Sequence, residues 1–441
     1  MAQNSTTRLA GGYGGAIGGR EGLLTDDTAR DLLERELGQF VSDVALTEEE
    51  RRHQEALVRK VEELARGCLH PSAQVLVFGS SASGLCEKSS DVDATIKVDF
   101  AYLAQKFHGT LATVAPSETR SLCAQAIASL AEYVAAQSEE QGELKLTIKK
   151  SITTAKVPIL ILASELGHTI DVSVNNELPI FNTTLLRTYA QIDERVRILV
   201  LCVKRWARLA GVTDAKSCNL SSYSWVLLCV YYLQVRHQIS APDPRTGQQE
   251  NPLLLSVQEV ALKQPETLFR DPSSGREFDV RCVANEAVVS RLVLYGSRMA
   301  ADCKASASDL LKGFFTFYAN AFQWGNEVVS VRCARRYSIN NHTEFAALAR
   351  GRFAQSTSPI HIEDPFDLQR NLNCVLDEQS LTRLKNAFLD VARRVASDVS
   401  YVGLLNQARL LFYGRQVVPS RGWYVETDVD GRSPERRVDL W

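Results

Sequence analysis

The sequence carries its most informative segment at residues 78–93, Phe78-Gly79-Ser80-Ser81-Ala82-Ser83-Gly84-Leu85-Cys86-Glu87-Lys88-Ser89-Ser90-Asp91-Val92-Asp93. The apolar run Gln74–Phe78 before it predicts a buried strand that ends at Gly79. Backbone N–H groups and hydroxyls in a Gly-Ser turn of this kind can hold phosphate oxygens. The turn is therefore a candidate phosphate cradle.

Two carboxylates follow this turn. Asp91 and Asp93 stand two residues apart at the start of a second predicted strand, Val92–Val98, so both side chains point to one face. Converging carboxylates repel unless a cation such as Mg²⁺ lies between them, and Mn²⁺ could replace it. A third carboxylate is expected from a neighbouring strand, and Asp171 in the alternating segment Thr169–Val174 fits. The alternative for each residue is a solvated carboxylate at a strand edge.

The remaining pattern predicts an α+β protein of two lobes. A predicted helix (Ser121–Ala136) and two further predicted strands (Leu144–Ile148 and Val157–Leu162) complete a mixed-sheet unit. Beyond Leu185 the periodicity is helical, most clearly at 191–210 and 222–239. The expected parts are a tail (1–24), a mixed-sheet catalytic palm (70–180), a helical domain (25–65 with 181–400), a loop-rich, proline-containing bridge within it (240–300), and a C-terminal extension (401–441).

Composition limits the possible functions. The 50 basic and 52 acidic residues leave a net charge of −2, which argues against a broad basic surface for nucleic acid but not against binding of an RNA 3′ end. No apolar run approaches the roughly 20 residues that cross a bilayer, so no membrane segment is predicted. The ten cysteines and seven histidines are dispersed, which indicates reduced thiols and no zinc site.

The acidic triad and the Gly-Ser segment resemble the DNA polymerase β-type nucleotidyltransferases, and within them the non-canonical poly(A) polymerases and terminal uridylyltransferases. The chain is similar in particular to compact trypanosomatid uridylyltransferases, including the mitochondrial enzyme associated with an editosome-like complex. The short interval between Asp93 and Asp171 leaves no room for the middle domain that the larger editing enzymes insert there. The resemblance implies a palm and a helical base-recognition domain with the nucleotide between them.

The resemblance also implies roles for individual residues. Asn182 and Thr183 would meet the sugar hydroxyls. The cations Lys204 and Arg208, one helical turn apart, would reach the β and γ phosphates, with Arg208 in place of a second lysine. The other implied nucleotide contacts are the turn residues Phe78, Gly79, Ser80 and Ser90, the phosphate-binding Ser222 and the base-stacking Tyr223. A solvated helix face for the two cations, and a core position for Tyr223, remain the alternatives.

Base choice is expected to lie in the segment Ile362–Asp367, which resembles the family's Ile-Glu-Asp-Pro-Phe/Tyr-Glu motif. Uracil N3 carries a hydrogen and cytosine N3 is an acceptor, so carboxylates at Asp364 and Asp367 favour uracil over cytosine. Adenine is the harder rival, since some uridylyltransferases exclude it with a histidine where this chain has Arg370. Asp367 stands where glutamate is usual, which favours a bridging water. Lys156 matches a family position near the RNA cleft.

The expected function is terminal RNA uridylyl transfer: UMP passes from UTP to an RNA 3′-OH, with release of pyrophosphate. Expected partners are UTP, the RNA 3′ end and an RNA-processing or editosome-like complex, with no membrane. A non-canonical poly(A) polymerase is the nearest alternative, and a non-catalytic scaffold subunit is the alternative of another class. The Gly/Ser/Thr-rich start of the chain, with Arg8 and Arg20, is compatible with mitochondrial targeting, and a cytoplasmic protein with a plain tail is the alternative.

Overall fold

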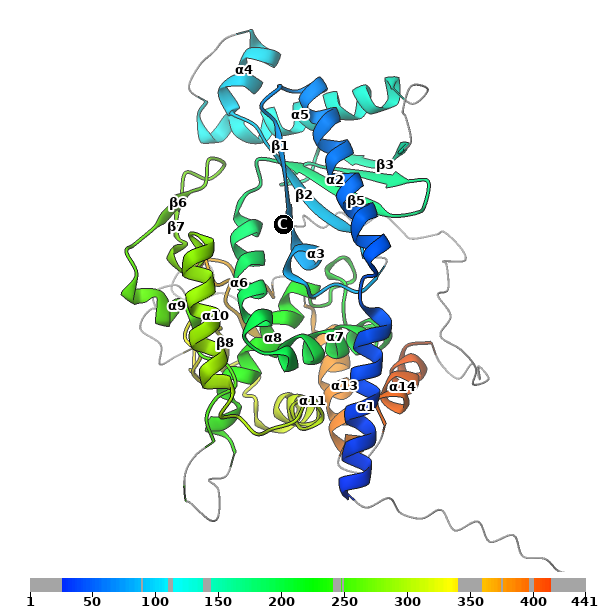
Figure 1. Cartoon of the computed structure of the whole chain (residues 1–441), viewed down its shortest axis with the longest axis vertical. Coiled ribbons are helices and arrows are strands. Elements are labelled where there is room, and N and C mark those ends of the chain that lie inside the picture. The colour runs from blue at the N-terminus through cyan, green and yellow to red at the C-terminus, as the bar shows by residue number, and fades with distance from the viewer. Residues whose placement is uncertain are drawn as a thin grey trace, which may run out of the picture.

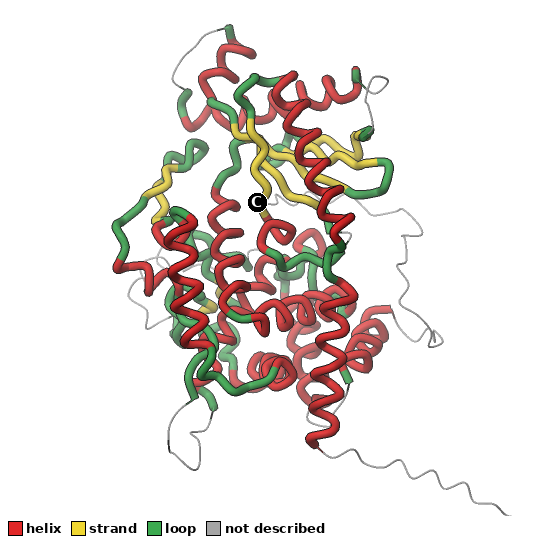
Figure 2. The backbone as a smooth tube through the Cα atoms, in the orientation of Figure 1, coloured by secondary structure: helices red, strands yellow, loops and turns green. Residues whose placement is uncertain are grey.

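The structure is a computed structural model of the chain. It describes residues 26–88, 90–109, 114–137, 144–240, 247, 250–339, 359–373, 376–395 and 400–413. The predicted tail and most of the predicted C-terminal extension lie outside these residues. Within them, the strands of the large sheet gather in one half of the molecule and most helices in the other (Figures 1 and 2).

The palm is built on a five-stranded sheet of order β1-β2-β5-β4-β3. Strands β2 and β5 pair in parallel, and the other neighbours in this sheet are antiparallel. Val92, Ala94 and Ile96 alternate toward the core, as a half-buried strand requires. The strand bounds are β1 (Gln74–Phe78), β2 (Val92–Lys97), β3 (Leu146–Ile152), β4 (Ile159–Ser164) and β5 (Thr169–Val174). All five predicted strands are confirmed, with shifts of a few residues at β3 and β4.

Helices α2 (Glu48–Cys68), α4 (Phe100–His108) and α5 (Pro116–Ala136) complete the palm. The capping box of Thr47 and Glu50 begins α2, and its buried face joins the same apolar core as α5 and the strands. This corrects the expectation that residues 25–65 all belong to the helical domain. Of this segment, α1 (Asp26–Val44) packs in the helical core and α2 does not, because an amphipathic pattern does not reveal which core it faces.

The helical domain is organised around α8 (Ser222–Val235), whose residues from Ser224 to Val235 are all buried. A helix that is apolar on every side must be surrounded by others. Those that share its core are α6 (Leu178–Ile192), α7 (Glu194–Leu209), α10 (Glu286–Ala300), α11 (Ala307–Thr316), α13 (Glu378–Val395) and α14 (Tyr401–Tyr413), besides α1. In the described residues, no helix is long and apolar enough to cross a membrane.

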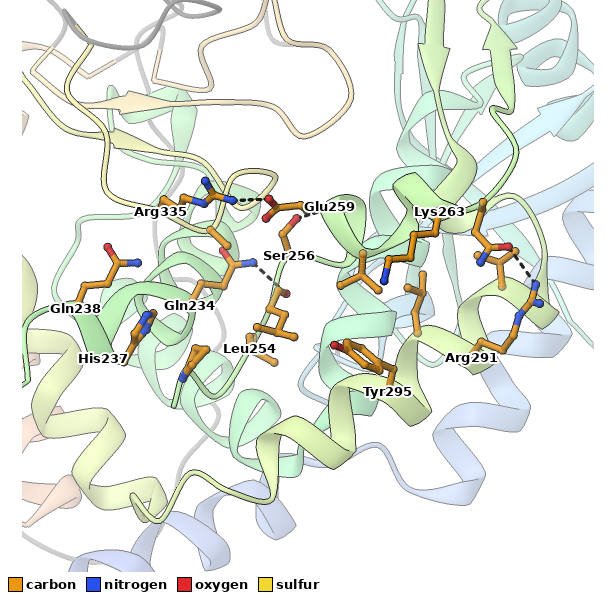
Figure 3. A pocket seen from close by; sticks show the side chains of 17 residues that line it. Gln234, His237, Gln238, Leu254, Ser256, Glu259, Lys263, Arg291, Tyr295 and Arg335 are labelled. Carbon is orange, nitrogen blue, oxygen red and sulfur yellow. Dashed lines mark hydrogen bonds and ion pairs between the residues drawn. The ribbon is translucent and has the colours of Figure 1, made fainter. Parts of the chain in front are cut away.

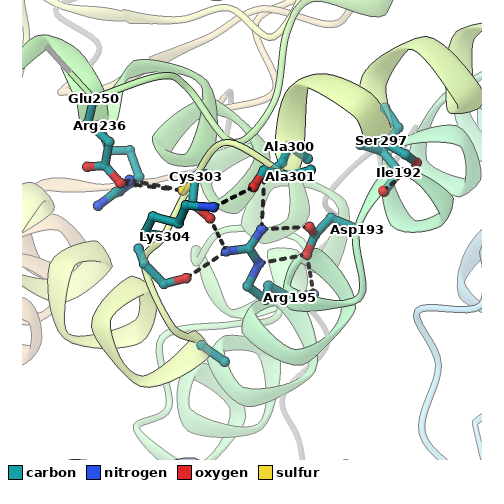
Figure 4. Close-up of polar contacts among 12 residues, drawn as sticks. Ile192, Asp193, Arg195, Arg236, Glu250, Ser297, Ala300, Ala301, Cys303 and Lys304 are labelled. Carbon is teal, nitrogen blue, oxygen red and sulfur yellow. Dashed lines mark hydrogen bonds and ion pairs between the residues drawn. The ribbon is translucent and has the colours of Figure 1, made fainter. Parts of the chain in front are cut away.

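Arg195, in the first turn of α7, ties that helix to the connection between α10 and α11 (Figure 4). Its guanidinium donates to the carbonyls of Ala300, Cys303 and Ala305 at 3.1, 2.9 and 2.7 Å. Asp193, the N-cap of α7, holds the same guanidinium in a two-bond ion pair. The contact satisfies the Ala300 carbonyl at the end of α10, which has no partner inside the helix, and two carbonyls of the connection that follows.

The bridging segment 240–300 is loop-like only in part. Its described residues contain α9 (Val257–Val260), 3₁₀ turns at 261–263 and 281–283, and the hairpin of β6 (Leu268–Arg270) with β7 (Glu277–Asp279). The expectation of loop is wrong for residues 286–300, because Asn285 caps the 15-residue helix α10. The hairpin reaches the palm, since a Cβ on Gly275 would lie 3.6 Å from Pro116 at the start of α5.

A short parallel pair of strands carries the segment predicted to read the base. It consists of β8 (Val328–Val329) and β9 (His361–Ile362), and all four residues are buried. The predicted motif therefore begins inside the helical domain and stays buried through Phe366, and Asp367 is its first residue that is only partly buried.

Candidate active site

The sheet places two of the predicted carboxylates side by side. Asp93 on β2 pairs in register with Asp171 on β5 and, on its other side, with Phe78 at the end of β1. Residues opposite one another on neighbouring strands project to the same face. The prediction that a neighbouring strand supplies Asp171 is therefore confirmed, and β1 runs from this point into α3 and the helical domain (Figure 1).

Gly79 makes this arrangement possible. Its φ is +78°, a left-handed conformation that favours glycine. A Cβ at this position would fall on the Asp93 carboxylate. The glycine thus allows β1 to turn directly against the acidic pair, and a larger residue would displace it.

The carboxylates of Asp93 and Asp171 lie close together where water has little access, and this changes the pKa of Asp93. Burial, together with the nearby carboxylates of Asp171 and Asp91, raises the pKa of Asp93 to about 7, while Lys204 opposes this shift. Like charges held close together disfavour the ionised form. The donor set consists of carboxylate oxygens, which suits Mg²⁺ or Mn²⁺ rather than a softer metal.

The third predicted carboxylate, Asp91, is bound to a neighbouring side chain. Its carboxylate accepts a hydrogen bond from the Thr169 hydroxyl at the start of β5. Among the described residues, no three His, Cys, Asp or Glu side chains are already arranged to hold a metal ion. Asp91 is exposed, so a rotation about its side-chain bonds would bring it toward an ion beside Asp93 and Asp171.

The predicted Gly-Ser turn is a short helix, α3 (Gly79–Ser83). The Gly79 N–H donates to the Thr183 hydroxyl at 2.8 Å, and this hydroxyl donates to the Pro179 carbonyl at 2.7 Å. Thr183 therefore braces α3 against α6, and its expected contact with the sugar stays a prediction. Ser80 is half-buried beside it, and Ser90 is half-buried next to Asp91.

The two predicted phosphate cations, Lys204 and Arg208, both lie against the loop that follows α3. Lys204 is buried and donates to the Leu85 carbonyl at 2.7 Å; burial lowers its pKa, and Glu87 opposes that shift. Glu87, itself buried, pairs with Arg205, while Arg208 is more exposed and its Nη1 lies 3.7 Å from Glu87 Oε2. The alternative of a solvated helix face is wrong for Lys204. Glu87 was not predicted, although it stands within the quoted segment.

The sugar and base contacts begin with a bond between two predicted residues. The Tyr223 hydroxyl donates to Asn182 Oδ1 at 2.9 Å, which leaves the Asn182 amide nitrogen as the group that can donate. Tyr223 is half-buried, and burial and the charge of Asp364 raise its pKa well above its usual range. Ser222 is exposed at the first position of α8, directly after the N-cap Ser221. The N–H groups of such a position have no partner inside the helix and can receive an anion.

The base-recognition segment is held by its own carboxylates. Asp364 is fully buried, and its Oδ1 accepts the N–H groups of Phe366 and Asp367 at 3.1 and 3.0 Å. Its Oδ2 has no hydrogen bond and lies 3.6 Å from Arg370 Nη1. Burial raises the pKa of Asp364, and Arg370 opposes it. Asp364 thus stabilises the turn through Oδ1, and its Oδ2 has no hydrogen bond.

Asp367 has a partner that the sequence did not indicate. Arg276 of the β6–β7 hairpin donates to Asp367 Oδ2 at 2.9 Å and to Oδ1 at 2.6 Å. The same Oδ1 also accepts the Gln369 N–H at 3.1 Å. The carboxylate expected to meet uracil is therefore paired in this structure.

The predicted RNA contact, Lys156, is exposed in the turn between β3 and β4. Arg120 of α5 holds this turn through the carbonyls of Thr153, Thr154 and Ala155. Lys156 lies on a fixed turn at the far side of the sheet from β1, and its role stays a prediction.

A hollow of about 690 Å³ lies in the helical domain between the end of α8, α9 and α10 (Figure 3). Its lining includes Gln234, Glu259, Lys263, Arg291 and Tyr295 but none of the residues predicted to bind the nucleotide. Its wall helix α9 also contacts the base-recognition segment, where Gln258 donates to the Pro365 carbonyl at 2.9 Å. The hollow therefore adjoins the base-recognition segment through α9, and none of the three predicted metal-binding carboxylates lines it.

Comparison with known proteins defines the class. The fold is shared with a solved Cid1 poly(U) polymerase bound to MgGTP, with a TM-score of 0.59 at 22% identity over 85% of this chain and 98% of that one. A cytoplasmic RNA terminal U-transferase gives a TM-score of 0.59 at 21% identity, covering 85% and 97%. The fold is therefore that of the polymerase β-type nucleotidyltransferases, as predicted.

Two models of protein families match separate parts of the chain. Residues 33–191 match "Poly(A) RNA polymerase, mitochondrial-like, central palm domain", and residues 306–370 match "Cid1 family poly A polymerase". Both matched segments are thus similar to the Cid1-like poly(A)/poly(U) polymerases, which are nucleotidyltransferases. It is 28% identical to poly(A) RNA polymerase GLD2 of Danio rerio over 76% of this chain, and 28% identical to terminal uridylyltransferase 7 of Homo sapiens over 74% of it. It spans 57% of the former and 18% of the latter.

Proposed function

We propose that this protein is a terminal RNA uridylyltransferase that transfers UMP from UTP to an RNA 3′-OH. The observation that carries the transfer reaction is the register of Asp93 with Asp171 beneath Gly79, with an Asp93 pKa raised to about 7. Such coupled carboxylates are costly to bury unless they bind a cation. Asp93 and Asp171, with Asp91 after its rotation, would hold divalent metal, which supplies positive charge to the reacting oxygens.

The reaction is a displacement at the α phosphorus. The RNA 3′ oxygen forms a bond to this phosphorus, the bond to the bridging oxygen of the β phosphate breaks, and pyrophosphate leaves. The proton of the 3′-OH passes to Asp171 or to water. Lys204 is buried and acts electrostatically on Asp93, and Arg208 is more exposed along the same helix, so these two cations would neutralise the charge that develops on the pyrophosphate.

The choice of UTP rests on the base-recognition segment. The buried Oδ2 of Asp364 has no hydrogen bond, although Arg370 Nη1 lies 3.6 Å away, and Asp367 belongs to the same turn, so an N–H on the base would meet acceptors. Uracil N3 offers such an N–H, whereas cytosine and adenine present an acceptor at the ring nitrogen of the pairing edge. The Asn182 amide, oriented by Tyr223, would donate to a ribose hydroxyl.

A poly(A) polymerase is the second candidate, since relatives with both activities in their names match this chain. The deciding experiment gives the purified protein Mg²⁺, a labelled RNA and each of the four NTPs in turn. We expect UMP addition by wild type and by Asp302→Asn, a surface control, and none by Asp93→Ala. Preferred addition of AMP would replace the uridylyl assignment with the adenylyl one. Equal activity of Asp93→Ala would remove the basis of the transferase assignment, and no addition by wild type with any NTP would favour a scaffold.

We further propose a mitochondrial RNA-processing complex as the setting, supported by the composition of residues 1–24 and the resemblance to editosome-associated enzymes. Fractionation with an antibody to the endogenous protein tests the compartment, and a cytoplasmic signal would contradict it.

A further inference from the structure

The β6–β7 hairpin presents Arg276 in a fixed direction. Asp271 opens its turn and accepts the N–H of Ser274 at 2.9 Å, and Gly275 takes a left-handed φ of +68°. The Arg276 guanidinium then lies over the Phe278 ring, 5.1 Å from its centroid. A turn closed by its own side chains leaves the next residue little conformational freedom.

The interaction between Arg276 and Asp367 is bidentate. Nη1 and Nη2 each donate to a different carboxylate oxygen, at 2.9 and 2.6 Å. A planar guanidinium bound in this way fixes the plane of the carboxylate, which a single-point contact does not. The Asp367 side chain is 17% exposed, so water screens the pair only in part.

The hairpin also packs on the base-recognition segment. Phe269 of β6 meets Phe181 of α6 with ring centroids 4.8 Å apart, and Phe181 meets Phe366 at 6.4 Å. Phe366 directly precedes Asp367 in sequence. The hairpin, α6 and the base-recognition segment therefore form one packed unit in which the Arg276–Asp367 bond is a polar contact.

We propose that Arg276 is a positioning residue for base selection, which holds the Asp367 carboxylate so that the remaining lone pair of Oδ2 faces the N3 hydrogen of uracil. This inference rests on the proposed uridylyl transfer. With the carboxylate fixed, the N1 acceptor of adenine meets an acceptor that cannot turn away. Without Arg276, Asp367 can rotate, and the penalty against adenine is lost along with the bond to uracil.

The test measures the ratio of kcat/KM for UTP to kcat/KM for ATP, and the ratio of the two nucleotides' Kd values in the absence of RNA. We expect Arg276→Gln to lower the preference for UTP in both measurements about tenfold, the effect of losing one well-placed bond to a charged group. Arg276→Lys should give an intermediate value, because lysine offers a single point charge. Arg270→Gln, an exposed arginine on the same hairpin, should leave the preference unchanged. A general loss of structure would lower UTP and ATP use together and leave the ratios intact.

The exchanged double variant R276D/D367R separates positioning from anchoring of the hairpin. We expect it to recover the Tm lost in Arg276→Gln but not the preference for UTP, because no acceptor stands at position 367. Recovered preference in this variant, or unchanged ratios in Arg276→Gln, would overturn the inference while the uridylyl assignment stands. A wild-type preference for ATP would overturn both.

Discussion

Replacing Asp93 with asparagine should abolish transfer and yet stabilise the metal-free protein. The pKa of Asp93 is raised from 3.8 to about 7, and at ~1.36 kcal/mol per pKa unit this corresponds to about 4 kcal/mol at most. Between these two pH values the folded protein keeps a proton that the unfolded chain has lost. Wild-type stability therefore falls as pH rises from about 4 to about 7 and is level above it. The neutral amide of the Asp93→Asn variant carries no such cost.

The assay is urea unfolding in EDTA at a series of pH values from 4 to 8, on wild type, Asp93→Asn and Asp302→Asn. The gap in the free energy of unfolding between Asp93→Asn and wild type should open across this range, while Asp302→Asn follows wild type. Added Mg²⁺ should narrow the gap at pH 8, since an ion bound only by the folded protein stabilises it. A gap that is constant with pH would refute the raised pKa of Asp93.

Three further predictions address the surrounding contacts. Thr183→Val should lower the free energy of unfolding by about 1–3 kcal/mol, because the Gly79 N–H loses its acceptor, and Thr183→Ser should not; denaturant unfolding of both variants decides. Asn182→Ala should reduce discrimination between UTP and dUTP, measured as a ratio of kcat/KM, and retained discrimination would show that the Asn182 amide does not meet the ribose. Arg332→Gln should destabilise the fold by about 3–5 kcal/mol, since Glu363, whose side chain is 1% exposed, keeps its charge without the 2.9 Å bond; a Tm equal to that of wild type would contradict this.

The sequence was sufficient to predict elements that depend on residues close together along the chain. Alternation and the Gly-Ser turn located β1 and β5 to the residue, and the need for a third carboxylate beside Asp93 led to Asp171 on the neighbouring strand. It failed where a contact joins distant segments. Arg276 precedes Asp367 by 91 residues, and Lys204 follows Leu85 by 119, so no periodicity links them. The same holds for α2, whose apolar stripe fits either core equally well.

The sequence also did not show the contacts that Thr183 makes within the protein. A threonine beside Asn182 suggests a sugar contact, which stays a prediction, and the structure adds hydrogen bonds of its hydroxyl with Gly79 and Pro179. A hydroxyl near the start of a helix has backbone groups within reach, and these compete with any ligand. Only the three-dimensional structure shows which backbone groups the Thr183 hydroxyl contacts.

The strand β3 lies at the edge of the palm sheet, and five of its seven residues are exposed. Unpaired edges of this kind invite another chain to add a strand, and lysines are a common protection against it. Lys149 and Lys150 stand in the middle of β3, so two copies meeting edge to edge would bring four ammonium groups together. The palm is thereby protected against self-assembly into ribbons. Replacing both lysines with acidic residues in one copy only would place opposite charges across the two β3 edges and convert this edge into a designed pairing site.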